Sequence, residues 1–170
     1  MGDEGGPNIA VIREHATQAI ELASTTNALQ ALGYPMLAES YIFEKKYQKA
    51  ADIARQGIVI NPWCSGCHHM LGDALLGLYQ EKNTRSALEE SIQEQEKTIE
   101  LVPLATHPYY SLGIGYFLRD DLQKAIITWQ KGLDYLSRDP HYPVWYKPEI
   151  EKELRGALKD PKQISARYHP

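Results

Sequence analysis

Apolar positions recur at helical spacing along most of the chain. Leu37 and Tyr41 lie four residues apart and share one face of a predicted helix, which we expect to open at Pro35. A second helix follows, and small side chains dominate its inward positions, which are Ala50, Ala54, Gly57 and Ile58. Small side chains let another helix approach closely, so residues 34–62 predict a tight antiparallel hairpin. Pro62 ends the second helix because proline lacks the backbone N–H.

This pattern of large and small residues returns twice. Leu37-Ala38 is matched by Leu71-Gly72 after 34 residues, and by Leu112-Gly113 after a further 41 residues. The other landmarks keep the same register, with Tyr41, Leu75 and Tyr116 one turn later, then Ala50, Ser91 and Ala125, then Gly57, Thr98 and Gly132. The sequence therefore predicts three successive helical hairpins.

The alternation resembles the tetratricopeptide repeat (TPR) family, whose period is 34 residues. The resemblance covers about residues 31–140 and implies an all-α, right-handed α-solenoid of about three hairpins. The second unit exceeds the period by seven residues, which lie between Leu75 and Ser91. Seven residues are nearly two helical turns, so they rotate the packing face by only about 20°. We expect a taller second hairpin with a break at residues 82–84 and a long return helix.

The chain divides into repeats and flanking segments. Proline 148 should begin a capping helix that covers the apolar face of the last repeat. The expected organisation is a disordered start at 1–8, an N-terminal helix within 9–30, repeats at 31–64, 65–105 and 106–140, a loop and capping helix at 141–160, and a tail at 161–170.

The resemblance also implies a function. TPR proteins act as adaptors in which the first helices of successive hairpins line a concave groove that holds a peptide or a helix. Projected onto this chain, the groove-facing residues are Glu39, Ile42, Phe43, His69, Asp73, Leu76, His107, Tyr110, Ile114 and Phe117. Glu39 and Asp73 stand where the carboxylate-binding subset of the family needs a cation or an amide. We therefore expect a basic, partly apolar protein or peptide partner. The alternative is that several of these aromatic residues pack within the array and bind nothing.

Both cysteines occur in one short motif, Cys64-Ser-Gly-Cys67-His68, which has the spacing of a c-type haem attachment site. In the haem interpretation the thiols hold the vinyl groups and His68 lies under the iron. Zn²⁺ is a second possibility, with ligands from Cys64, Cys67, His68 and His69, but four nearly contiguous residues cannot easily all reach one tetrahedral ion, so a second segment would have to contribute. A reversible disulfide is a third possibility, and a purely structural role for Cys67 as a small buried side chain is the fourth. Our principal prediction is a chain without cofactor.

Composition restricts the remaining classes of function. The formal net charge of −4 and pI near 5.9 do not favour nucleic-acid binding, which requires clustered Lys and Arg. The apolar runs are far shorter than the ~20 residues of a membrane span. The acidic, glycine-rich start lacks the pattern of a secretory signal, so we predict a cytoplasmic protein, or an exported one if haem is attached. No catalytic triad, phosphate loop or carboxylate pair is legible, which predicts a protein that is not an enzyme.

Overall fold

The computed structural model describes residues 8–22, 27–136, 138 and 147–163, which form helices and, within these ranges, no strand. The helices are α1 (Ile9–Leu22), α2 (Asn27–Phe43), α3 (Tyr47–Ile60), α4 (Ser65–Lys82), α5 (Arg85–Leu101), α6 (His107–Leu118), α7 (Leu122–Leu136) and α8 (Lys147–Lys159). The predicted all-α solenoid of hairpins is confirmed. The predicted disordered start, the loop after residue 140 and most of the predicted tail lie outside the described residues.

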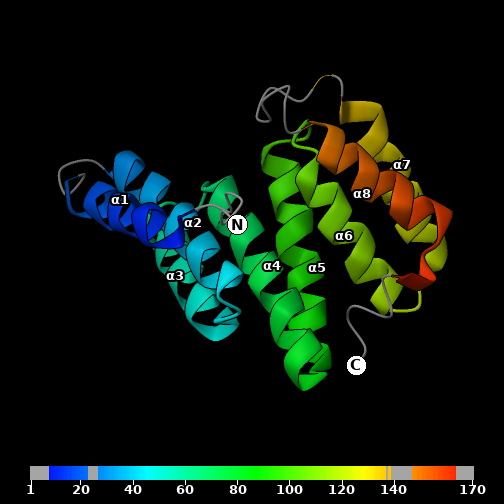
Figure 1. Cartoon of the computed structure of the whole chain (residues 1–170), viewed down its shortest axis with the longest axis horizontal. Helices are drawn as coiled ribbons and strands as arrows, with labels where there is room; N and C mark the ends of the chain where they lie inside the picture. The colour runs from blue at the N-terminus through cyan, green and yellow to red at the C-terminus, as the bar shows by residue number, and fades with distance from the viewer. Residues whose placement is uncertain (1–7, 23–26, 137, 139–146, 164–170) are drawn as a thin grey trace, which may run out of the picture.

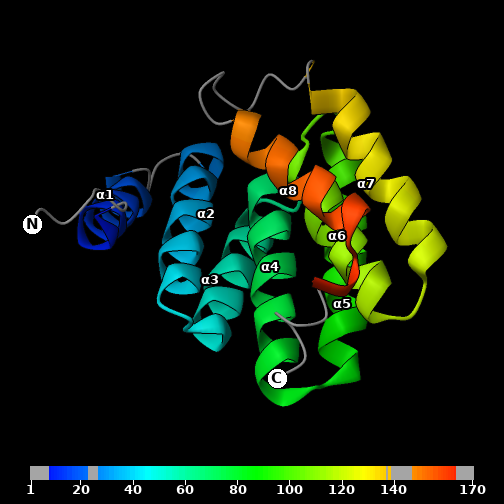
Figure 2. The same cartoon turned by 45° about the vertical axis from the view of Figure 1, so that its right-hand side comes forward.

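The helices pack in chain order (Figures 1 and 2). Helices α2 and α3, α4 and α5, and α6 and α7 form the three hairpins, while α1 packs on α2 and α8 packs on α7. The first helices also contact one another, α2 with α4 and α4 with α6. Such contacts place α2, α4 and α6 along one face of the array, which we call the inner face.

Helix α2 differs from the prediction. It begins at Asn27 rather than at Pro35, so the boundary expected at residue 31 falls inside the helix and Pro35 lies in its interior. A proline there removes one helical hydrogen bond and costs about 3 kcal/mol. Packing on both sides offsets this cost. A Cβ on Gly33 would lie 2.6 Å from Cγ1 of Ile20 in α1, and the Pro35 ring packs within 3.0 Å of the Cβ position of Gly66 in α4.

The second hairpin is taller, as the seven extra residues predict. Helices α4 and α5 contain 18 and 17 residues, against 12 and 15 for α6 and α7, and Figure 1 shows this hairpin reaching beyond its neighbours. The break falls at Asn83, whose φ of 49° is left-handed and whose N–H donates to the Tyr79 carbonyl at 2.7 Å. Asparagine tolerates this conformation, so it ends α4 and turns the chain into α5.

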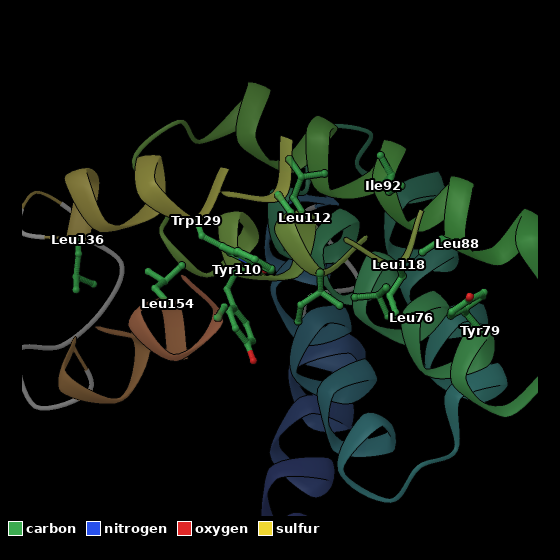
Figure 3. Close-up of a cluster of buried hydrophobic side chains, with 13 residues drawn as sticks. Leu76, Tyr79, Leu88, Ile92, Tyr110, Leu112, Leu118, Trp129, Leu136 and Leu154 are labelled. Atoms are coloured by element: carbon green, nitrogen blue, oxygen red, sulfur yellow. The ribbon is translucent and has the colours of Figure 1, made fainter. Parts of the chain in front are cut away.

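The third hairpin and the capping helix share one apolar core (Figure 3). Trp129 is completely buried, and its indole N–H donates to the Tyr110 carbonyl at 3.1 Å. Leu154 of α8 is also fully buried against this cluster, and Glu151 pairs with Arg155 at 2.7 Å on the outer side. The apolar stripe of α8 thus covers the last repeat, as expected of a capping helix. None of the described helices combines the length and apolar character that crossing a membrane requires.

Candidate interaction groove

The inner face contains a hollow of about 180 Å³ between α2, α4 and α6. Six of the ten predicted groove residues line it, namely Ile42, Asp73, Leu76, His107, Tyr110 and Ile114. Tyr47, Gly77, Gln80 and Ser111 complete the lining. Residues that are far apart in the sequence, one set from each hairpin, therefore converge on a single concavity. We call this hollow and its rim the groove.

The other four predicted residues occupy different positions. His69 is buried beside Asp73 without lining the hollow, and Glu39 is exposed on α2, also outside the lining. Phe43 is 51% exposed at the end of α2, outside the lining of the hollow. Phe117 packs on Trp129, with ring centroids 6.4 Å apart, and so lies with the core of the third hairpin. The alternative that some aromatic residues pack within the array applies to Phe117.

A hydrogen-bonded cluster organises the polar side of the groove. The amide Nε2 of Gln95 donates to Oδ1 of Asp73 at 2.8 Å and to the carbonyl of His69 at 3.2 Å. Oε1 of Gln95 therefore faces Nδ1 of His69, at 2.8 Å, and accepts its proton. Nε2 of His69 is left as an acceptor, 2.8 Å from Nδ1 of His107, which donates to it. The same Nε2 lies 3.5 Å from Oδ2 of Asp73.

The carboxylates near this cluster influence each other. Glu39 is exposed, yet protein atoms crowd its carboxyl group, and this partial desolvation raises the pKa of Glu39. His69 opposes the rise in pKa and the neighbouring charge of Asp73 adds to it. The two carboxylates therefore act on the same small region, which is acidic.

Gln95 is a site residue that the sequence reasoning missed. It is fully buried on α5 together with Ser91, whose hydroxyl donates to the Gly72 carbonyl at 2.8 Å. Gly72 has no side chain, and this leaves the space that Gln95 fills, because a Cβ there would collide with the amide. The available signal was the position of Gln95 on the inward stripe of α5 with Leu88, Ile92 and Thr98, where a polar residue needs a buried partner.

The cysteine motif forms the start of α4. Cys64 and Cys67 are joined by a disulfide, and Sγ of Cys64 caps the helix by accepting from the Cys67 N–H at 3.2 Å. Both ring nitrogens of His68 contact protein oxygens, Nδ1 with Glu94 at 2.6 Å and Nε2 with the carbonyl of Pro62 at 3.1 Å. The hydrogen bond to Glu94 is the main cause that raises the pKa of His68, while burial acts against it.

Of the interpretations open from the sequence, this arrangement corresponds to the disulfide. A cysteine sulfur in a disulfide is neither a thiolate ligand nor a group that can hold a haem vinyl carbon. The residues as arranged therefore do not fit haem attachment or zinc binding at Cys64, Cys67 and His68.

The state of this motif can be measured by mass. Protein from its native source should have the unmodified chain mass of about 19.3 kDa, lowered only by the two hydrogens lost in the disulfide. Intact mass spectrometry before and after reduction checks this, and alkylation should label cysteines only in the reduced sample. A covalent haem increment, with Soret absorbance that survives denaturation, would contradict the disulfide assignment.

The fold and the groove together define an α-solenoid of helical hairpins. Neither the known protein-family profiles nor the curated protein sequences contain a match to the chain. Solved structures of MamA are similar to it in three dimensions. The crystal structure of MamA shares 18% identity over 79% of this chain and 82% of that chain, with a TM-score of 0.55.

Two further structures extend the comparison. The MamA RS-1 ArsTM double mutant shares 16% identity over 93% of this chain and 98% of that chain, with a TM-score of 0.54. MamA 41-end from Desulfovibrio magneticus RS-1 shares 15% identity over 95% of both chains, with a TM-score of 0.54. At such identities the likeness concerns the fold, and it supports a TPR-type repeat architecture.

Proposed function

We propose that this chain is a non-catalytic interaction scaffold whose groove holds a basic, partly apolar segment of a partner protein. The observation that carries the proposal is one hollow of the inner face that side chains from three hairpins line, with the carboxylate of Asp73 in the lining and that of Glu39 near enough to feel its charge. We propose a cytoplasmic location as well, in keeping with the sequence-based prediction.

The charge of the groove favours a cationic partner. The Asp73 side chain is only 19% exposed, and the carboxyl group of Glu39 is partly desolvated. Charges that are partly removed from water attract an opposite charge more strongly than fully solvated ones. The uncharged lining, including Ile42 and Tyr110, offers surface to the aliphatic part of the same segment.

A larger hollow of about 430 Å³ lies against α3, outside the inner face. It is lined by Tyr34, Asp52, Arg55, Gln56, Val59 and Ile60. Its charges are already paired within the chain, because Arg55 contacts Glu90 at 2.7 Å and Asp52 at 3.9 Å. Size alone does not specify a ligand. We therefore assign the partner to the smaller groove, whose lining contains the carboxylate of Asp73 and no Lys or Arg.

Charge reversal in the groove should weaken binding of a basic segment. We expect Glu39→Lys combined with Asp73→Lys to reduce affinity for a Lys- and Leu-containing peptide about tenfold or more, or about 1.4 kcal/mol. The remaining binding should depend less on salt, because the attraction between opposite charges is lost. Titrations at two ionic strengths measure both effects, with a peptide in which Glu replaces Lys as the reference.

A matched variant changes the same net charge elsewhere. Asp52→Lys with Glu100→Lys alters two exposed carboxylates on α3 and α5, and should leave affinity almost unchanged at moderate salt. Asp73→Asn alone provides a milder change for comparison. Equal weakening by both charge-reversed pairs, or preference for the acidic peptide, would refute the assignment of the groove.

A further inference from the structure

Three ligand groups meet at the edge of the groove. The donor atoms of His69, Asp73 and His107 lie within 4.8 Å of one another. We propose that these side chains bind a divalent transition-metal ion, with Zn²⁺ as the best-suited member of the class. The ion would join α4 to α6 and so connect the second and third hairpins.

The spacing of the donors suits this ion. His69 and Asp73 are four residues apart on α4 and share one face, while His107 enters from the first residue of α6. Zinc bonds of 2.0–2.1 Å in a tetrahedron place ligand atoms about 3.3 Å apart. The observed separations are 2.8 Å from His69 Nε2 to His107 Nδ1 and 3.5 Å from His69 Nε2 to Asp73 Oδ2. These two separations lie within about half an ångström of the tetrahedral value, and the third pair of donor atoms lies within 4.8 Å.

Gln95 supplies the outer support that metal ligands require. Its Oε1 accepts from Nδ1–H of His69, which leaves the Nε2 lone pair directed at the site. Its Nε2 holds Oδ1 of Asp73, so that Oδ2 faces the same point. Gln95 is fully buried, and its orientation is fixed because it also bonds the His69 carbonyl. Gln95 therefore holds His69 and Asp73 in fixed orientations from within the core.

Binding would require a change of tautomer at His107. Its Nδ1–H now donates to His69, so coordination through Nδ1 needs the tautomer with the proton on Nε2, and no net proton is released. Two imidazoles and a carboxylate suit Zn²⁺ and its neighbours in the transition series better than Ca²⁺ or Mg²⁺, which prefer oxygen ligands. Asp73 and His107 also line the hollow, so a fourth ligand could approach from the groove.

The site does not depend on the proposed partner. The ion would, however, neutralise the charge of Asp73, so Zn²⁺ and a cationic side chain would compete for the same carboxylate. Metal binding is therefore measured without peptide, so that its failure is distinct from failure of the proposed function.

The test uses the full chain, oxidised and stripped of metal by a chelator. We expect calorimetry with Zn²⁺ to give one site per chain, and Co²⁺ to give the ligand-field absorbance of a tetrahedral site. His107→Gln and Asp73→Asn should each weaken Zn²⁺ binding more than tenfold, and Gln95→Met by about 10- to 100-fold through loss of ligand orientation. His15→Gln, an exposed histidine on α1, should bind as the unmodified chain does.

Circular dichroism of each variant separates loss of ligand from loss of fold. If a variant unfolds, the Co²⁺ spectrum of the unmodified chain decides the matter, because surface histidines do not give a single tetrahedral site. The proposal is overturned if the unmodified chain shows no saturable Zn²⁺ binding, or if His15→Gln and His107→Gln weaken it equally.

Discussion

Replacement of Trp129 by alanine should lower the free energy of unfolding by about 3–5 kcal/mol, the largest effect that we expect from any single substitution. Trp129 has no exposed surface, and it packs among Tyr110 and Leu112 from α6 and Leu154 from α8 (Figure 3). Truncation would leave a cavity and would remove the hydrogen bond from the indole to the Tyr110 carbonyl. Urea denaturation followed by circular dichroism measures the change.

Trp63 provides a matched control. It is 73% exposed at the turn before α4, where the ammonium group of Lys97 lies 5.7 Å from its ring. Trp63→Ala should change stability by less than about 0.5 kcal/mol, as is usual for surface substitutions. Similar losses in the two variants would show that Trp129 does not form the centre of the C-terminal core.

Gly113→Ala should destabilise the chain by about 1–3 kcal/mol through overpacking. Gly113 faces the indole ring of Trp129, and an added Cβ would overlap the pyrrole edge of the ring. The ring is fully buried and cannot move aside at low cost. Thermal and urea melts of the variant measure the loss.

Gly156 on α8 serves as the comparison, because it lies inside a helix with nothing within 4 Å of its Cβ position. Gly156→Ala should raise stability by about 0.5–1 kcal/mol, since alanine loses less backbone entropy in a helix. The two substitutions are chemically identical and should have opposite signs. A stabilising Gly113→Ala would mean that α6 and α7 do not approach as closely as described.

The close helix contacts could be predicted from the sequence because small residues mark them directly. Gly113 meets Trp129 and Gly57 meets Tyr34, in both cases where a Cβ would overlap the neighbour. The spacing of these small residues repeats with the hairpins, so one local pattern contains the information about distant contacts. The taller second hairpin could also be predicted from the sequence. An insertion of nearly a whole number of helical turns lengthens the helices and leaves their packing face in place.

The start of α2 was predicted wrongly because the rule for proline is local. Pro35 was expected to open a helix, whereas packing of Gly33 on α1 and of the Pro35 ring beside Gly66 keeps it in the interior of one. Tertiary contacts of this kind are not visible in the neighbouring sequence. The preference of proline for the first turn was outweighed by them.

The polar cluster was only partly predictable. His69, Asp73 and His107 were assigned to the groove by their position on first helices, yet their mutual contacts depend on Gln95. Gln95 lies on the second helix of the hairpin and bonds residues 22 and 26 positions earlier. The spacing of residues along one helix predicts which face a side chain lies on. Predicting a hydrogen bond between two helices also requires knowledge of how the helices are rotated relative to each other.

The cysteine motif shows a different limit. The same spacing of Cys64, Cys67 and His68 is compatible with haem, zinc or a disulfide, since each chemistry needs two nearby sulfur atoms. The choice depends on what else surrounds His68, and here Glu94 from the next helix and the Pro62 carbonyl occupy its ring nitrogens.

Photo-crosslinking most directly tests whether the inner face of α2, α4 and α6 is the binding surface. A benzoylphenylalanine replaces either Ile42, which lines the groove, or Val59, which is 82% exposed beside the larger hollow on α3. After irradiation with the native partner, mass spectrometry identifies the attached segment. We predict that the Ile42 position captures one segment that contains Lys or Arg next to apolar residues, and that the Val59 position captures none. Capture at Val59 alone, or of an acidic segment at Ile42, would contradict a groove that binds basic partners.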